Sequence, residues 1–169
     1  MRTQKILALT LIFVSLAIEI AIICCKSCSR NVPMNYLLLL MFTVCEAFIF
    51  SYITAFCAGE SVLMSAGMTV GMTVVLTAYA CCTKTDFTTC GGLFFVLSIA
   101  MFFLVAFSTF FIFASWWYPV LSAILVVIYG FFLIYDTQLI AGSGSHGLSY
   151  DEYIIGALIL YVDIMMIFF

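Results

Sequence analysis

Six apolar segments, each close to the length needed to cross a lipid bilayer, constrain this chain more than any other feature. A membrane-spanning helix needs about 17–25 mostly apolar residues. Only 8% of the 169 residues are charged, whereas soluble domains carry about 25%. The sequence therefore predicts an all-α fold in one transmembrane domain over residues 1–169, a polytopic bundle of about six transmembrane helices whose solvent is the lipid bilayer. The predicted spans are Ile6–Cys25, Tyr36–Cys57, Val62–Cys82, Gly92–Ser115, Tyr118–Ala141 and Tyr153–Phe169.

Short polar breaks separate these segments. Pro33 lies in the first polar break and removes a backbone hydrogen-bond donor, which disfavours a continuous helix. The last break, Gly142–Ser149, is rich in glycine and serine. Ser149 and Glu152 follow it with the S-x-x-E spacing of a capping box, in which each residue satisfies a free backbone N–H of the other. We therefore predict that the last helix begins at this pair.

The basic residues predict how the chain is oriented in the membrane. Lys26, Arg30 and Lys84 fall in the first and third loops, and the even-numbered loops contain none. Loops that carry lysine and arginine usually face the cytosol. Two basic residues near the N-terminus lie on the opposite side and count against this assignment. The odd loops, including Gly142–Ser149, are predicted to be cytosolic. With five basic residues in all, a nucleic-acid partner is excluded.

Four carboxylates lie inside the apolar segments: Glu19, Glu46, Asp136 and Asp163. A charged Asp near the bilayer centre costs about 2.5–3.5 kcal/mol on insertion scales. We therefore expect these groups to be neutral, paired or facing water. Glu46 lines an ion pathway or has a purely structural role, and both alternatives stay open. Glu19 is expected to extend toward the basic residues Lys26 or Arg30 at the membrane edge.

Asp136 and Asp163 lie on consecutive, antiparallel predicted helices. Counting 1.5 Å of rise per residue places them at depths that differ by about 13 Å, so contact requires tilt or unequal protrusion of the helices. In contact, the two carboxylates could not both ionise comfortably and would share one proton. Such a pair would sense pH and, once deprotonated, could ligate calcium through hard oxygen ligands. The alternative is a structural hydrogen bond that fixes helix packing.

Several short strings occur in an order that resembles the transmembrane Bax-inhibitor-motif family, and most closely its lifeguard branch. The resemblance covers nearly the whole chain, which is expected to begin at the second of the family's seven helices. The chain departs from the family pattern at Ala47, Tyr150 and Ile159. The matching strings are Pro33-Met34-Asn35-Tyr36, Phe42-Thr43-x-x-Glu46, Thr83-Lys84-x-Asp86-Phe87-Thr88, Tyr135-Asp136-Thr137-Gln138-Leu139-Ile140 and Leu160-Tyr161-x-Asp163-Ile164.

The resemblance implies a pH-sensitive calcium leak in endomembranes, either the endoplasmic reticulum or the Golgi, and suppression of cell death. It implies that Asp136 and Asp163 form the proton-linked gate and that Arg30 holds the closed state. Calcium is then the permeant or bound ion, and no other cofactor is expected. Death-regulating membrane proteins are the implied partners.

Two other classes of protein compete with this hypothesis. A non-conducting scaffold that binds death-regulating or channel partners would need no ion pathway. Intramembrane aspartyl proteases also use two aspartates on neighbouring helices, the first in a Tyr-Asp motif like Tyr135-Asp136. They carry the second in Gly-x-Gly-Asp, whereas this chain has Leu160-Tyr161-Val162-Asp163. We therefore do not expect an enzyme, and no catalytic residue is assigned.

The predicted orientation can be tested at the last loop. A glycosylation tag inserted at Gly144 should stay unmodified, and a cysteine placed there should react with a reagent applied from the cytosolic side. Both results follow from a cytosolic position for residues 143–148. Modification of the tag by lumenal enzymes would overturn the assignment.

Overall fold

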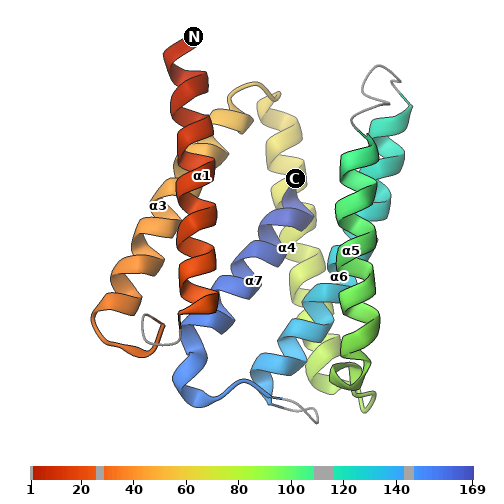
Figure 1. Ribbon diagram of the computed structural model, residues 1–169. Helices are drawn as coiled ribbons and strands as arrows, with labels where there is room; N and C mark the ends of the chain where they lie inside the picture. Colours follow the sequence, from red (N-terminus) through yellow and green to blue (C-terminus); the bar gives the residue numbers. More distant parts are fainter. Residues whose placement is uncertain (1, 26–28, 109–115, 143–146) are drawn as a thin grey trace. The chain divides into compact units, whose positions relative to one another are not determined.

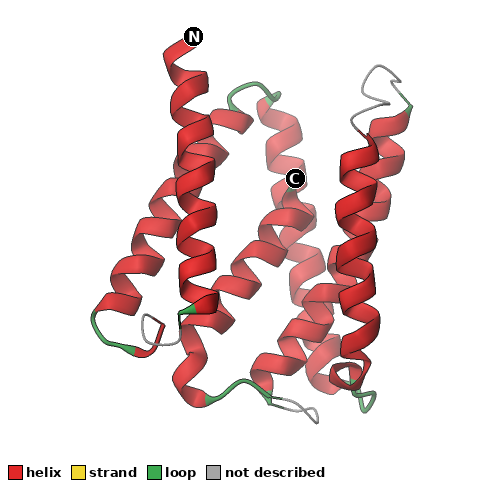
Figure 2. Ribbon diagram, in the orientation of Figure 1, coloured by secondary structure: helices red, strands yellow, loops and turns green. Residues whose placement is uncertain are grey.

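A computed structural model describes residues 2–25, 29–108, 116–142 and 147–169. These residues are almost entirely helical and include no strand (Figure 2). The all-α prediction is therefore confirmed. The long helices in chain order are α1 (Arg2–Cys24), α3 (Met34–Thr54), α4 (Gly59–Cys82), α5 (Gly91–Ser108), α6 (Trp117–Ala141) and α7 (Tyr153–Phe168), and the short 3₁₀ helices are η1 (Phe87–Cys90) and η3 (Tyr150–Glu152) (Figure 1).

Among the described residues, five stretches of helix are long and apolar enough to cross a membrane. They lie in α1, α3, α4, α6 and the combined η1–α5 segment, close to the predicted spans. The helix α7 is equally apolar but has 16 residues, which at 1.5 Å per residue amounts to about 24 Å. The chain is thus an integral, multi-pass membrane protein. Residues 109–115, the end of the fourth predicted span, lie outside the described residues.

Large apolar side chains point outward along these helices. Leu63 is 76% exposed, Phe102 71% and Phe95 67%. A water-soluble protein rarely exposes so much contiguous apolar surface, but lipid tails solvate it readily. The helices themselves satisfy the backbone hydrogen bonds that a membrane interior leaves without water. The exposed surface therefore fits a chain surrounded by lipid.

The chain divides into two compact units, and α7 contributes to both. The first unit comprises Met1–Ala66 with Ser149–Leu158, and the second comprises Gly67–Leu148 with Ile159–Phe169. The prediction of a single domain is not tested by this division and stays a prediction. The two units are described separately below.

In the first unit, α1 and α3 lie side by side (Figure 1). Buried residues recur on each helix with the same spacing of seven, three and four positions, which is one face of a helix. No side-chain hydrogen bond is needed to explain this packing, because most of the buried groups are apolar or small. The buried positions are Ala8, Ser15, Ile18 and Ile22 on α1, and Asn35, Phe42, Cys45 and Ile49 on α3.

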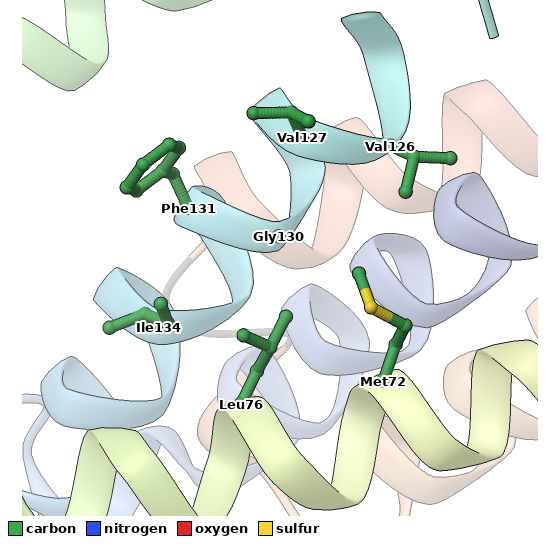
Figure 3. Close-up of a pocket in the computed structure, with 7 residues that line it drawn as sticks. All are labelled: Met72, Leu76, Val126, Val127, Gly130, Phe131 and Ile134. Atoms are coloured by element: carbon green, nitrogen blue, oxygen red, sulfur yellow. The ribbon is translucent and has the colours of Figure 1, made fainter. Parts of the chain in front are cut away.

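In the second unit, α6 packs against α5 and η1 and lies alongside α4. Side chains of α4 and α6 line an open apolar pocket of about 200 Å³ (Figure 3). Gly130 of α6 lines it, and a Cβ built there would lie 3.3 Å from Leu76 Cδ1 of α4. The missing side chain of Gly130 therefore lets the two helices approach closely.

The last helix begins at Tyr153, as its predicted span does, but the predicted capping box does not form as expected. Ser149 has the extended backbone of an N-cap residue, but its side chain makes no capping hydrogen bond. The turn is closed by Glu152 N–H donating to Ser149 O at 2.8 Å, and α7 starts only at Tyr153. The capping-box prediction was wrong for Ser149, whose side chain makes no capping bond, and the Glu152 carboxylate is paired with Arg30.

The close approach at Gly130 generates a stability prediction. Gly130→Ala should raise stability by up to about 1 kcal/mol, the helix-propensity gain of Ala over Gly. The neighbouring pocket gives the Leu76 methyl group room to move away from the new Cβ. Thermal unfolding in detergent measures the change, and Gly71→Ala, where no atom lies within 4 Å of the added Cβ, serves as the control. A clear loss of stability confined to Gly130→Ala would contradict the expectation.

Candidate functional site

The two intramembrane aspartates come together in the second unit. Asp136 on α6 is 9% exposed and Asp163 on α7 is 5% exposed. Their carboxyl groups face each other within hydrogen-bonding range. The phenol of Tyr129, two turns before Asp136 on α6, also interacts electrostatically with Asp163. The structure therefore places both predicted gate residues in one buried polar cluster.

Counting α7 from Tyr153 accounts for part of the difference between this contact and the depths counted from the sequence. Counted from Tyr153 rather than from Ser149, Asp163 lies about 15 Å along its helix. Asp136 lies about 7.5 Å from the end of α6. The difference in depth falls from about 13 Å to about 8 Å, and a smaller displacement of the helices brings the two groups into contact.

Two polar atoms in this region have no hydrogen-bond partner among the described residues: Asp163 Oδ2 and Thr137 Oγ1. Membrane-helix hydroxyls elsewhere donate to the carbonyl four residues earlier, as Thr43 does to Leu39 O at 2.8 Å and Ser98 to Phe94 O at 2.9 Å. Thr137 makes no such bond. The site therefore retains unused donor and acceptor capacity in a place where an unsatisfied polar group is costly.

Chemically, this cluster can hold a proton between two carboxyl groups, release it, and offer hard oxygen ligands to a cation. The described residues contain no group of three or more His, Cys, Asp or Glu side chains that could hold a metal ion. Carboxylate ligation here would therefore come from the aspartate pair, with hydroxyl, carbonyl or water oxygens completing the shell.

Arg30, the predicted gate partner, lies in the first unit. Its guanidinium donates to Glu152 Oε1 at 2.8 Å, with the two side chains 42% and 18% exposed. One residue further on, the Tyr153 hydroxyl accepts a hydrogen bond from Asn35 Nδ2 at 3.0 Å. These contacts tie the start of α7 to Arg30, which precedes α3, and to Asn35 in the first turn of α3. A role for Arg30 in the gate stays a prediction.

Glu46, the predicted pathway residue, is half-buried on α3. Its carboxylate interacts electrostatically with that of Glu19 on α1, so the two acids lie in one part of the α1–α3 packing. The sequence analysis treated them separately and expected Glu19 to approach Lys26 or Arg30. Arg30 instead pairs with Glu152, and Lys26 lies outside the described residues.

Two buried polar residues were not singled out from the sequence. Asn35 is fully buried and Gln138 is 3% exposed, and the side chains of both make long-range hydrogen bonds. Both occur in the strings that carried the family resemblance. A polar amide within an apolar helix was the available signal, since such a group must find a partner in the folded protein.

Comparison with known proteins assigns the chain to a family. A family model described as "Inhibitor of apoptosis-promoting Bax1" matches residues 1–169. The chain is similar to "Protein lifeguard 3" of Mus musculus, with 43% identity over 53 residues, which are 31% of this chain and 17% of the mouse protein. It is similar to "Protein lifeguard 3" of Homo sapiens, with 39% identity over 56 residues, which are 33% of this chain and 18% of the human protein.

The matches to these two relatives thus span less than a fifth of their length. No solved structure matches the chain. The family model, in contrast, covers every residue, including both aspartate motifs and the Arg30 segment. This protein therefore belongs to the family of inhibitors of apoptosis-promoting Bax1.

Proposed function

We propose that this protein is a pH-sensitive calcium leak channel, or a regulator of calcium in endomembranes, gated by the pair Asp136–Asp163. The observation that supports it is the contact between two buried carboxyl groups within the membrane-spanning part of the chain. Buried ionisable groups within membrane helices are functional by default, because they are costly to place there.

A shared proton gives the pair two states of different charge. With the proton in place, one carboxyl group donates to the other, and the hydrogen bond joins α6 to α7 with a single net negative charge. Without it, two negative charges lie in contact at a site of low dielectric. The pair then separates or takes up a cation, and calcium suits such oxygen ligands. Proton release and cation entry are thereby coupled.

The cellular part of the proposal follows from the family. Membership in a family of inhibitors of apoptosis-promoting Bax1 supports a role in suppressing cell death. We place that role in the endoplasmic reticulum or the Golgi, with death-regulating membrane proteins as partners. The competing proposal, a non-conducting scaffold, requires the same partners but no ion flux, so flux into liposomes containing the purified protein separates the two.

The aspartate pair generates the central functional prediction. Asp136→Asn and Asp163→Asn should each flatten the pH dependence of calcium flux in liposomes, because Asn keeps the size and most hydrogen bonding but cannot titrate. The double variant should add little, since residues that act as one unit are not additive. Glu46→Gln, which alters a half-buried carboxylate of the other unit, is the matched control and should leave the pH response in place.

Two outcomes would contradict this gate. One is a pH response that survives intact in both single variants. The other is a pair of independent effects that add in the double variant. A chain that carries no calcium flux under any of these conditions would favour the scaffold.

The ion pair of Arg30 and Glu152 generates a second prediction. Arg30→Ala should raise the leak by up to about fivefold, the factor that corresponds to the upper end, about 1 kcal/mol, for exposed ion pairs. Glu152→Gln should act in the same direction, because it removes the same contact at the start of the helix that carries Asp163. Flux unchanged in Arg30→Ala combined with Lys26→Ala would remove this role from both residues.

A further inference from the structure

We infer that Gln138 is a positioning residue of the aspartate pair: its side-chain amide fixes the rotation of α6 and thereby aims Asp136 at Asp163. The inference rests on the proposed gate. It goes beyond it by assigning a role to a residue that neither titrates nor contacts an ion. The evidence is a set of three hydrogen bonds to backbone groups, which we call the Gln138 clamp.

The clamp joins α6 to the loop that connects α4 with η1. Gln138 Nε2 donates to Thr85 O at 2.9 Å and to Ala80 O at 3.2 Å. Gln138 Oε1 accepts from Phe87 N–H at 2.9 Å. Both amide hydrogens and the amide oxygen are therefore used, in a side chain that is 3% exposed.

Each partner of Gln138 is a backbone group that needs a hydrogen-bond partner from outside its own helix. Ala80 O belongs to the last turn of α4, where the carbonyls have no partner within the helix. Thr85 O and Phe87 N–H belong to the short loop before η1 and its first residue. Only a side chain with two donors and an acceptor at its tip can serve all three groups from one position, and an amide is such a side chain.

The loop held by the clamp has side-chain hydrogen bonds of its own. Asp86 Oδ1 accepts from Thr88 N–H at 2.9 Å and from Thr88 Oγ1 at 2.6 Å, which caps η1. One turn before Gln138, the ring of Tyr135 packs on Phe94 of α5 with centroids 4.3 Å apart. The end of α6 is thus attached at Gln138 to the turn at η1 and, one helical turn earlier at Tyr135, to α5.

The clamp and the aspartate pair lie on opposite sides of α6. Successive helix residues are rotated by about 100°, so Gln138 and Asp136 are about 200° apart. Gln138 faces α4 and η1, whereas Asp136 faces α7. Any rotation of α6 that weakens the clamp therefore turns the Asp136 carboxyl group away from Asp163, and displacement of the loop has the same effect.

The other titratable groups near the Gln138 clamp do not provide another explanation for a change in the titration of Asp136 and Asp163. Lys84 and Asp86 are the charged residues of the loop, and residues 67–82 and 91–108 contain no charged residue. The uncharged titratable groups of these elements are Tyr79, Cys81, Cys82 and Cys90, with Tyr135 on α6 itself. Asp136 is faced by Asp163, and Asp163 also interacts with Tyr129.

The first arm of the test measures the clamp without any ion flux. In the purified full chain, Gln138→Met keeps the length of the side chain and removes all three hydrogen bonds. Amide hydrogen exchange of residues 83–88 should become roughly fivefold faster, the effect expected for loss of a typical net hydrogen bond. Gln138→Glu keeps an acceptor for Phe87 N–H and should fall between wild type and Gln138→Met.

The control variant is Leu133→Ala, which truncates a fully buried apolar side chain of the same helix. It should lower the melting temperature without a selective increase of exchange in residues 83–88. Exchange in that segment that is unchanged in Gln138→Met, or raised equally by Leu133→Ala, would overturn the clamp.

The second arm measures the pH profile of calcium flux in liposomes. Gln138→Met should shift or flatten the profile, Leu133→Ala should leave its midpoint in place, and Gln138→Met should add nothing in the Asp136→Asn background. A wild-type pH profile in Gln138→Met, together with a flattened profile in Asp136→Asn, would overturn the role of Gln138 and leave the proposed gate standing. A wild-type profile in Asp136→Asn would overturn the proposed gate itself, and the exchange arm would still decide whether the clamp exists.

Discussion

A carboxyl group inside a membrane must find a partner, and the contact between Asp136 and Asp163 meets this requirement for two groups at once. The rest of the second unit is arranged around it. An isolated charge at this depth would cost several kcal/mol, while a pair that shares one proton carries one charge over four oxygens. The contact also links α6 to α7, and the proposed gate couples the protonation of the pair to the packing of these helices.

The helix α6 contributes a different surface to each neighbour. Gly130 removes a side chain where Leu76 of α4 approaches. The Gln138 side chain supplies hydrogen-bond partners to backbone groups at the end of α4 and in the segment that follows it. Tyr135 packs on α5. The helix then ends at Gly142, whose backbone is left-handed with φ of 61°, a conformation that glycine adopts at little cost. Close packing, polar clamping and the proton site thus share one helix.

The sequence predicted the membrane class and most of the spans, because hydrophobic length is a local property of the chain. It permitted a contact between Asp136 and Asp163 without deciding it. It did not predict the partners of Gln138 or Arg30. Those partners are backbone groups in one case and Glu152 in the other, and sequence spacing says nothing about contacts over such separations. The predicted capping bond of Ser149 is absent, and the sequence did not indicate that Glu152 pairs with Arg30.

The depth count illustrates a further limit of the sequence. The rise per residue of an α-helix is well defined, but the sequence does not define the residue at which the helix begins, and the depth of Asp163 is counted from that residue. The three residues of η3 precede α7, and counting from Tyr153 reduces the expected difference in depth of the two acids by about 5 Å. A pattern of apolar residues cannot distinguish a 3₁₀ turn from the first turn of an α-helix, although this difference decides whether the aspartates come close to level.

The most direct test of the account is whether the pair holds a proton at neutral pH. Infrared spectroscopy of the purified protein at neutral pH detects the stretching band of a protonated carboxyl group. The account predicts such a band in the wild-type protein and its loss in the Asp136→Asn/Asp163→Asn double variant, while Glu46→Gln leaves it in place. A spectrum in which the double variant retains the full band, or in which the wild-type protein has none, would contradict the shared proton.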